Sequence, residues 1–176
     1  MHQRDTLIRT RSVRRRMFFL LAGWAGLSWL TGLLLLLRLP DHPLAQAAAA
    51  QCVIWGVLNS GFGLFGLRQA HRADRAAINP TTIQRELADR ERLIRLLQFS
   101  ARVSLAFLAL AGLVLAAGLI LRTAAAIGHG AAMVIQTTFL CFFDRTFLAR
   151  LTLPDIHAQN QADNPTEAID APGSGR

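Results

Sequence analysis

The sequence predicts an all-α membrane protein, with a four-transmembrane-helix bundle and a cytoplasmic helical hairpin between the second and third spans. The first observation behind this prediction is a set of four apolar runs without a charged residue, at residues 17–37, 44–67, 103–121 and 123–143. Each run is long enough to cross a bilayer as a helix, which takes roughly 20 residues. The second observation is the absence of the alternating pattern of a β-barrel, the other structure that satisfies its backbone within hydrocarbon.

These runs divide the chain into segments of different composition. The segment before the first run is basic, and the segment after the last run is acidic, rich in proline and poor in apolar residues, which is typical of disorder. The predicted organisation is a basic cytoplasmic N-terminus at 1–16, a transmembrane domain at 17–151 that includes the hairpin at 68–102, and a disordered acidic tail at 152–176.

The basic residues predict the orientation. All 19 are arginines, and only Arg38 and Arg122 lie in the loops on the far side of the four runs. Because basic residues are enriched in cytoplasmic segments, both termini and the hairpin are expected in the cytoplasm of a bacterium, with the bundle in its inner membrane. Topology therefore explains the net charge of +8, and we expect no nucleic-acid partner, which would call for a basic face on a soluble domain.

A cleaved secretory signal is the alternative interpretation of the first run. Arg15-Arg16-Met17-Phe18 resembles a twin-arginine start, and Ala45-Gln46-Ala47 offers a cleavage site. The run is longer than a typical signal core, and the site leads directly into another apolar run. Both observations favour a retained span.

The segment between the second and third runs predicts the helical hairpin. Asn79-Pro80 predicts a turn, and Thr81 with Gln84 has capping-box spacing. No helix-breaking residue follows, so one helix is expected over 81–121, about 60 Å long. The polar face offers three i,i+4 ion pairs, Arg85–Asp89, Glu86–Arg90 and Glu91–Arg95.

The apolar residues of the same helix share the opposite face. They are Ile83, Leu87, Ile94 and Leu97. This face either packs on residues 68–78 or on the lipid interface, or it docks a partner protein. These four residues are therefore the candidate partner-binding residues.

Polar residues within the runs mark a candidate ligand-binding face. Gln51, Trp55 and Asn59 are spaced i, i+4, i+8 and share one side of the second helix. The fourth run and its end add His129, Gln136 and Asp144. These groups either hydrogen-bond between helices or bind a small molecule or ion.

Glycines of the second run match the dinucleotide-binding pattern G-x-G-x-x-G, but here the pattern lies within a membrane helix rather than after a strand. We therefore expect close helix packing at Gly56, Gly61, Gly63 and Gly66.

Two short motifs carry a resemblance. Trp55-Gly56-Val57-Leu58-Asn59 followed by a glycine-rich helix end, together with Gln136 and Phe142-Phe143-Asp144, resembles an uncharacterised family of small bacterial four-span membrane proteins. The resemblance covers the second and fourth spans and implies the four-span architecture. The family has no assigned activity, so it implies positions to test (Trp55, Asn59, Gln136 and Asp144) and no chemistry.

No catalytic motif is present, and we predict no catalytic residue, metal site or cofactor. The expected function is a non-enzymatic scaffold or an assembly partner that acts through the cytoplasmic hairpin. Its expected partners are the lipid bilayer and either a second copy of the chain or another membrane protein. The alternative is a binding or transport protein that holds a lipid, quinone or other small molecule against Trp55, Asn59 and Gln136.

Overall fold

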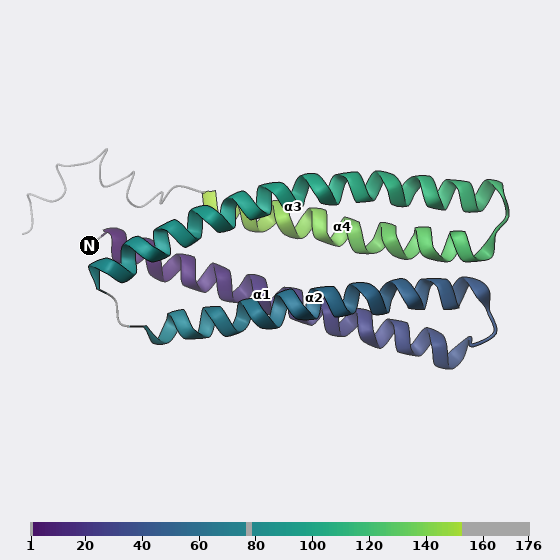
Figure 1. The fold of residues 1–176 in the computed structure, drawn as a ribbon, viewed down its shortest axis with the longest axis horizontal. Helices are drawn as coiled ribbons and strands as arrows, with labels where there is room; N and C mark the ends of the chain where they lie inside the picture. The colour runs from purple at the N-terminus through teal and green to yellow at the C-terminus, as the bar shows by residue number, and fades with distance from the viewer. Residues whose placement is uncertain (1, 77–78, 153–176) are drawn as a thin grey trace, which may run out of the picture.

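The computed structural model describes residues 2–76 and 79–152. These residues form four helices and no strand: α1 (His2–Arg38), α2 (Pro43–Arg75), α3 (Pro80–Ile120) and α4 (Ala124–Thr152) (Figure 1). Each helix contains a stretch long and apolar enough to cross a membrane. The prediction of an all-α chain with four span-length helices is confirmed, and the fold is compatible with a multi-pass membrane protein. Beyond Thr152, the expected disordered tail lies outside the described residues.

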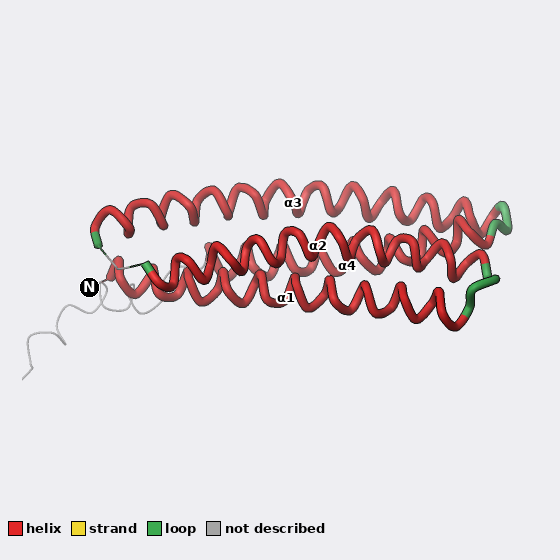
Figure 2. The backbone as a smooth tube through the Cα atoms, turned by 60° about the horizontal axis from the view of Figure 1, so that its bottom comes forward, coloured by secondary structure: helices red, strands yellow, loops and turns green. Residues whose placement is uncertain are grey.

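The helices pack as two antiparallel pairs. α1 packs along α2, α3 packs along α4, and the two pairs meet chiefly through α2 and α4. Figure 2 shows both short turns, α1–α2 and α3–α4, at the same end of the molecule, with the N-terminus at the opposite end. α2 and α4 therefore run in the same direction.

Local signals explain the boundaries of α3. Pro80 is its first residue, and the Asn79 side chain caps it by accepting a hydrogen bond from the backbone N–H of Thr82 at 2.7 Å. The expected capping box at Thr81 is wrong, because the cap lies two residues earlier. From there α3 continues unbroken to Ile120, which confirms the predicted long helix. The turn into α4 places Arg122 at φ 54°, in the left-handed region.

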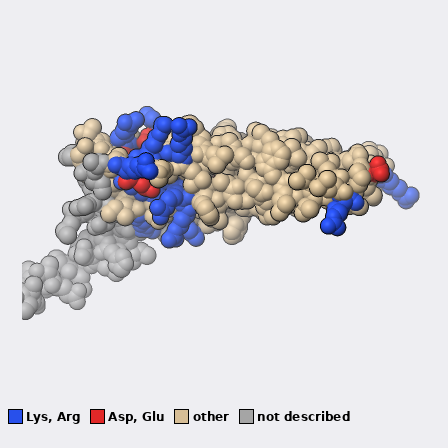
Figure 3. All heavy atoms as spheres, turned by 90° about the horizontal axis from the view of Figure 1, so that it is seen from below, with Lys and Arg blue, Asp and Glu red and all other residues tan. Residues whose placement is uncertain are grey.

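Charged side chains are concentrated at one end of the bundle. Figure 3 shows arginine and acidic side chains gathered at the end that holds the N-terminus, a long uncharged middle, and few charges at the end with the turns. We call the first region the charged end; it comprises residues 2–16 and 68–75 of α1 and α2, with residues 80–102 and 144–152 of α3 and α4. We call the uncharged middle the apolar waist. The residues expected as a basic cytoplasmic N-terminus, from His2 on, are the first turns of α1.

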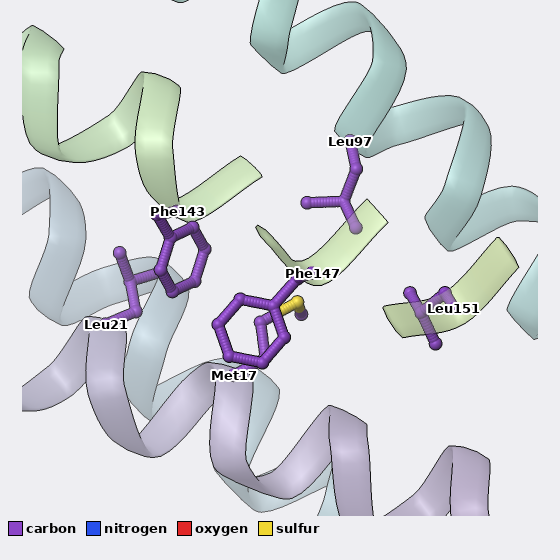
Figure 4. Packing of buried hydrophobic residues seen from close by; sticks show 6 residues of the cluster. All are labelled: Met17, Leu21, Leu97, Phe143, Phe147 and Leu151. Atoms are coloured by element: carbon purple, nitrogen blue, oxygen red, sulfur yellow. The ribbon is translucent and has the colours of Figure 1, made fainter. Parts of the chain in front are cut away.

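A hydrophobic cluster lies where the waist meets the charged end (Figure 4). Its fully buried members come from α1, α3 and α4: Met17, Leu21, Leu97, Phe143, Phe147 and Leu151. Ile94 packs against the cluster from α3. Within the described residues, the start of α3 packs on α1 and α4 rather than on residues 68–76, so the expected packing of this hairpin on itself is not seen there. The charged end is a continuation of all four helices.

Candidate functional site

Gln136 of α4 is the centre of a buried polar cluster in the waist. Its side chain is 3% exposed, and its Oε1 accepts a hydrogen bond from the Trp24 indole N–H at 2.7 Å. Its Nε2 donates to the Ser28 hydroxyl at 3.1 Å. The Trp24 ring also stacks on Phe139, with centroids 4.0 Å apart. These contacts join α4 to α1, so both functional groups of the Gln136 amide are used in holding two helices together.

The residues that complete this cluster, Trp24 and Ser28, were missed in the sequence. They are spaced i, i+4 in the first apolar run, the same pattern that marked Trp55 and Asn59 in the second. The i, i+4 spacing of Trp24 and Ser28 could therefore have been noticed in the sequence. The sequence does not indicate that Gln136 faces α1, since Gln136 lies 108 to 112 positions from Ser28 and Trp24.

The three residues of the predicted polar stripe on α2, Gln51, Trp55 and Asn59, have different surroundings. Asn59 is only 4% exposed, and its Nδ2 is shielded from solvent with no hydrogen-bond partner. Trp55 is half-buried and meets Phe107 of α3 edge to face, with centroids 6.3 Å apart. Gln51 is half-buried. Asn59 is thus the member of the stripe whose amide group is unsatisfied within the bundle.

Asp144 lies apart from Gln136, close to the charged end. Its side chain is 3% exposed, and its Oδ2 accepts hydrogen bonds from the hydroxyls of Ser100 at 2.7 Å and Ser104 at 3.3 Å. This carboxylate therefore joins α4 to α3. His129, near the opposite end of α4, is half-buried and its Nδ1 has no partner. His129, Gln136 and Asp144 thus lie at three separate positions along the axis of α4, and they do not form one site.

Three of the four glycines singled out on α2 lie against α1. A Cβ atom at Gly63 would lie 2.9 Å from the backbone nitrogen of Ala22, and one at Gly56 would lie 3.0 Å from the Trp29 ring. A Cβ at Gly66 would overlap the ring of Phe18. Gly61 differs, because its Cβ position has no neighbour within 4 Å. Gly61 is exposed, and its Cβ position faces no neighbouring helix in the described part of the chain.

The apolar face of α3 turns toward the bundle. Leu97 is 6% exposed, and Ile83, Leu87 and Ile94 are half-buried. Between residues 81 and 102, most of the exposed residues of α3 are polar or charged, and Leu96 and Phe99 are exposed apolar residues among them. The four apolar residues singled out in the sequence thus face the bundle, and a partner that approaches this part of α3 from outside meets mainly polar side chains first.

A buried ion pair joins α1 to α3 at the charged end. The Arg11 Nε lies 3.0 and 3.1 Å from the two Glu86 carboxylate oxygens, and its Nη2 lies 2.5 Å from Oε1. Both side chains are about nine-tenths buried. Glu86 thus pairs across the bundle rather than with Arg90 along its own helix, whereas the predicted Glu91–Arg95 contact forms at 3.9 Å. This ion pair has no local signal in the sequence, because its members are 75 residues apart.

Within the described part of the chain, no group of three or more His, Cys, Asp or Glu side chains is arranged to hold a metal ion. Cys52 and Cys141 are free thiols. The polar groups of the bundle mainly join one helix to another, and Asn59 and His129 each retain an unpartnered nitrogen.

Comparison with known proteins identifies a family for this chain. No curated protein and no solved structure matches the chain. A family model matches residues 20–145, a region that covers the apolar waist of all four helices and the polar residues Trp24, Asn59, Gln136 and Asp144. This match covers well over half of the sequence, so the chain belongs to the family of unknown function DUF6992.

Proposed function

We propose that this protein is a multi-pass protein of a bacterial inner membrane, with both termini and the charged end in the cytoplasm, that acts as a non-enzymatic scaffold or assembly partner. Its docking surface is the outward face of α3 at the charged end. This face consists of exposed residues at helical spacing, namely Gln84, Arg85, Ala88, Arg92 and Arg95. The apolar face of α3, which the sequence offered for this role, is turned toward the bundle and is less suited to it.

The observation that carries the proposal is how the polar groups are distributed between interior and surface. Inside, Gln136, Asp144 and Glu86 are bonded to neighbouring helices. Outside, the side chains of Arg92 and Arg95 are 73% and 67% exposed, and the only carboxylates they contact among the described residues lie 3.9 Å away. Such loose surface pairs contribute little to stability, so these charges remain available for a partner.

The continuity of α3 supports the same role. The helix runs unbroken from Pro80 through the waist to Ile120. From Arg85 to the border of the waist at Arg102 it rises about 25 Å, at 1.5 Å per residue. A partner bound on this face would be held at a fixed height above the membrane. This is a geometry suited to a scaffold.

Site-specific photo-crosslinking in cells tests the docking surface. A photoreactive amino acid at Gln84 or Ala88 should give a covalent adduct with one and the same protein, whereas the outward-facing waist positions Gly61 and Leu113 should not. Charge reversal by Arg85→Glu with Arg92→Glu should reduce this adduct at least tenfold, because it reverses the charge that the partner recognises. The matched control Arg72→Glu with Arg75→Glu, on α2, should leave it unchanged. An adduct that survives reversal on α3, or none from either position, would refute the docking surface.

Asn59 favours a second candidate function, the binding of a small molecule within the bundle. A buried amide N–H without an acceptor costs about 1–3 kcal/mol. A carbonyl or hydroxyl oxygen of a lipid, quinone or similar molecule would supply the acceptor that Asn59 Nδ2 lacks. In this case α2 and its neighbours form a binding site rather than only an anchor.

Native mass spectrometry of the protein in mild detergent tests this candidate. The wild type should retain a small-molecule adduct, and Asn59→Leu should lose it while being at least as stable as the ligand-free wild type, because the substitution removes no protein hydrogen bond to Nδ2 and removes an unsatisfied buried N–H. Gln136→Leu is the control: it should lower stability by about 1–2 kcal/mol, since two interhelical hydrogen bonds are lost, yet keep the adduct. An adduct retained in Asn59→Leu would exclude this site.

A further inference from the structure

The border between the waist and the charged end carries one arginine on each helix. On α1, α2 and α3 the arginine is the residue next to the apolar run, and on α4 it follows Asp144. All four arginines are exposed: Arg16 on α1, Arg68 on α2, Arg102 on α3 and Arg145 on α4. We call this set the arginine collar. Because it draws one member from each helix, it surrounds the bundle instead of marking a single face.

Exposed phenylalanines accompany the collar. Each collar arginine has a phenylalanine three residues away, and residues three apart lie on the same face of a helix. Their exposed fractions are 68% at Phe19, 65% at Phe65, 66% at Phe99 and 74% at Phe142. Phe19, Phe65 and Phe142 lie on the waist side of their arginine, and Phe99 lies on the other side. Each helix therefore presents a cation and an aromatic ring together to the outside.

The collar has no counter-charge within the described chain. None of its four guanidinium groups forms an ion pair with a described carboxylate. Asp144 is the one acid at this height among the described residues, and it is buried and bonded to Ser100 and Ser104. Among the described residues the collar thus lacks a carboxylate that balances its charge, so its four guanidinium groups are available to an external anion.

The height of the collar identifies where that charge lies. Arg16 and Arg38 are separated by about 33 Å of helix, and Arg102 and Arg122 by about 30 Å, at 1.5 Å per residue. The hydrocarbon core of a bilayer is about 30 Å thick. With the two turns in one headgroup layer, the collar lies in the other, at the level of the phosphates.

We propose that the arginine collar and its phenylalanines form a binding surface for anionic phospholipids of one leaflet. The guanidinium groups take the phosphate oxygens as charge-assisted acceptors, and the rings of Phe19, Phe65 and Phe142, on the waist side, pack against the glycerol and upper acyl region. The circumferential arrangement and the paired aromatic rings favour a lipid over a nucleic acid or a protein, either of which would approach from one side. The inference requires the protein to lie in a bilayer, but it does not require the docking surface on α3.

Lipid titration followed by native mass spectrometry tests the collar on the full-length protein in neutral detergent. Phosphatidylglycerol should be retained more strongly than phosphatidylcholine with the same acyl chains. The collar variant, with Arg16→Gln, Arg68→Gln, Arg102→Gln and Arg145→Gln, should lose that retention by roughly 600-fold, since each of the four arginines near anionic headgroups contributes about a factor of five. A matched variant, with Arg72→Gln, Arg75→Gln, Arg85→Gln and Arg92→Gln, removes the same charge away from the border and should lose less than about threefold.

Three results would overturn the proposal. If the collar variant and the matched variant lose the same amount of lipid retention, retention depends on overall charge rather than on the collar. If phosphatidylglycerol and phosphatidylcholine are retained equally, the protein does not recognise headgroup charge. If inorganic phosphate at the same concentration displaces phosphatidylglycerol, the collar is a site for free anions. If the collar variant does not fold, Arg16→Gln with Arg68→Gln and Arg102→Gln with Arg145→Gln are tested as separate pairs. Each pair should lose retention by roughly 25-fold, from two such factors of about five, and replacing all four by lysine should keep the preference. An unchanged preference in both pairs would also refute the collar.

Discussion

Replacing Glu86 with leucine is expected to lower the free energy of unfolding by about 3–5 kcal/mol, the cost of leaving one member of a buried ion pair without its partner. Arg11 would then remain buried with no carboxylate among the described residues to accept its three hydrogen bonds to Glu86. Denaturant unfolding in mild detergent, followed by circular dichroism, measures the change.

Two further variants separate this ion pair from other effects of the substitution. Glu91→Leu removes an exposed carboxylate 3.9 Å from Arg95 on the same helix, and should change stability by less than about 0.5 kcal/mol. The double variant Arg11→Leu with Glu86→Leu should recover most of the loss, because two packed leucines replace two desolvated charges. Equal losses in Glu86→Leu and Glu91→Leu would show that the pair is not buried as described.

Replacing Gly63 with alanine is expected to destabilise the α1–α2 contact by about 1–3 kcal/mol, the usual cost of overpacking. The added methyl would lie 2.9 Å from the backbone nitrogen of Ala22 and 3.1 Å from its Cα. Backbone atoms cannot move away as the end of a flexible side chain can, so α1 and α2 must separate. Unfolding of the purified protein in detergent gives the change in stability.

Gly61→Ala is the matched control, two residues away on the same helix. Nothing lies within 4 Å of its Cβ position, and alanine is the better helix former, so stability should stay constant or rise by up to about 1 kcal/mol. If both substitutions are neutral, the helices are further apart than the structure has them. A loss at Gly61 as large as that at Gly63 would instead indicate that Gly61 faces a second copy of the chain.

The sequence was sufficient to predict the helices because the relevant signals are local. The length of each apolar run predicts a span, Asn79-Pro80 predicts the break between α2 and α3, and the absence of breakers predicts the full length of α3. Even the wrong cap at Thr81 was a choice between two local motifs two residues apart.

The pairing of the helices could not be predicted in the same way. A helix in lipid is apolar on its outer face as well as its inner face, so hydrophobic periodicity does not tell which side meets a neighbour. That is why Gln136 was expected near Trp55 and Asn59, whereas it bonds to Trp24 and Ser28. The Arg11–Glu86 pair was missed because the basic residues before the first run were interpreted only as a topology signal. Gly61 and Gly63 belong to one motif in the sequence, and only the crossing of α1 over α2 separates them.

The division into two antiparallel pairs has a consequence for how such a chain is made. α1 packs along α2 and α3 along α4, so each pair consists of two helices that follow one another in the chain and are joined by one short turn. The first pair can therefore form its contacts while the ribosome is still translating the second. The bonds from Gln136 to Trp24 and Ser28 require α4, and so they form only after the first pair has been made. The order of the helices along the chain thus favours assembly in two stages, first within each pair and then between the pairs.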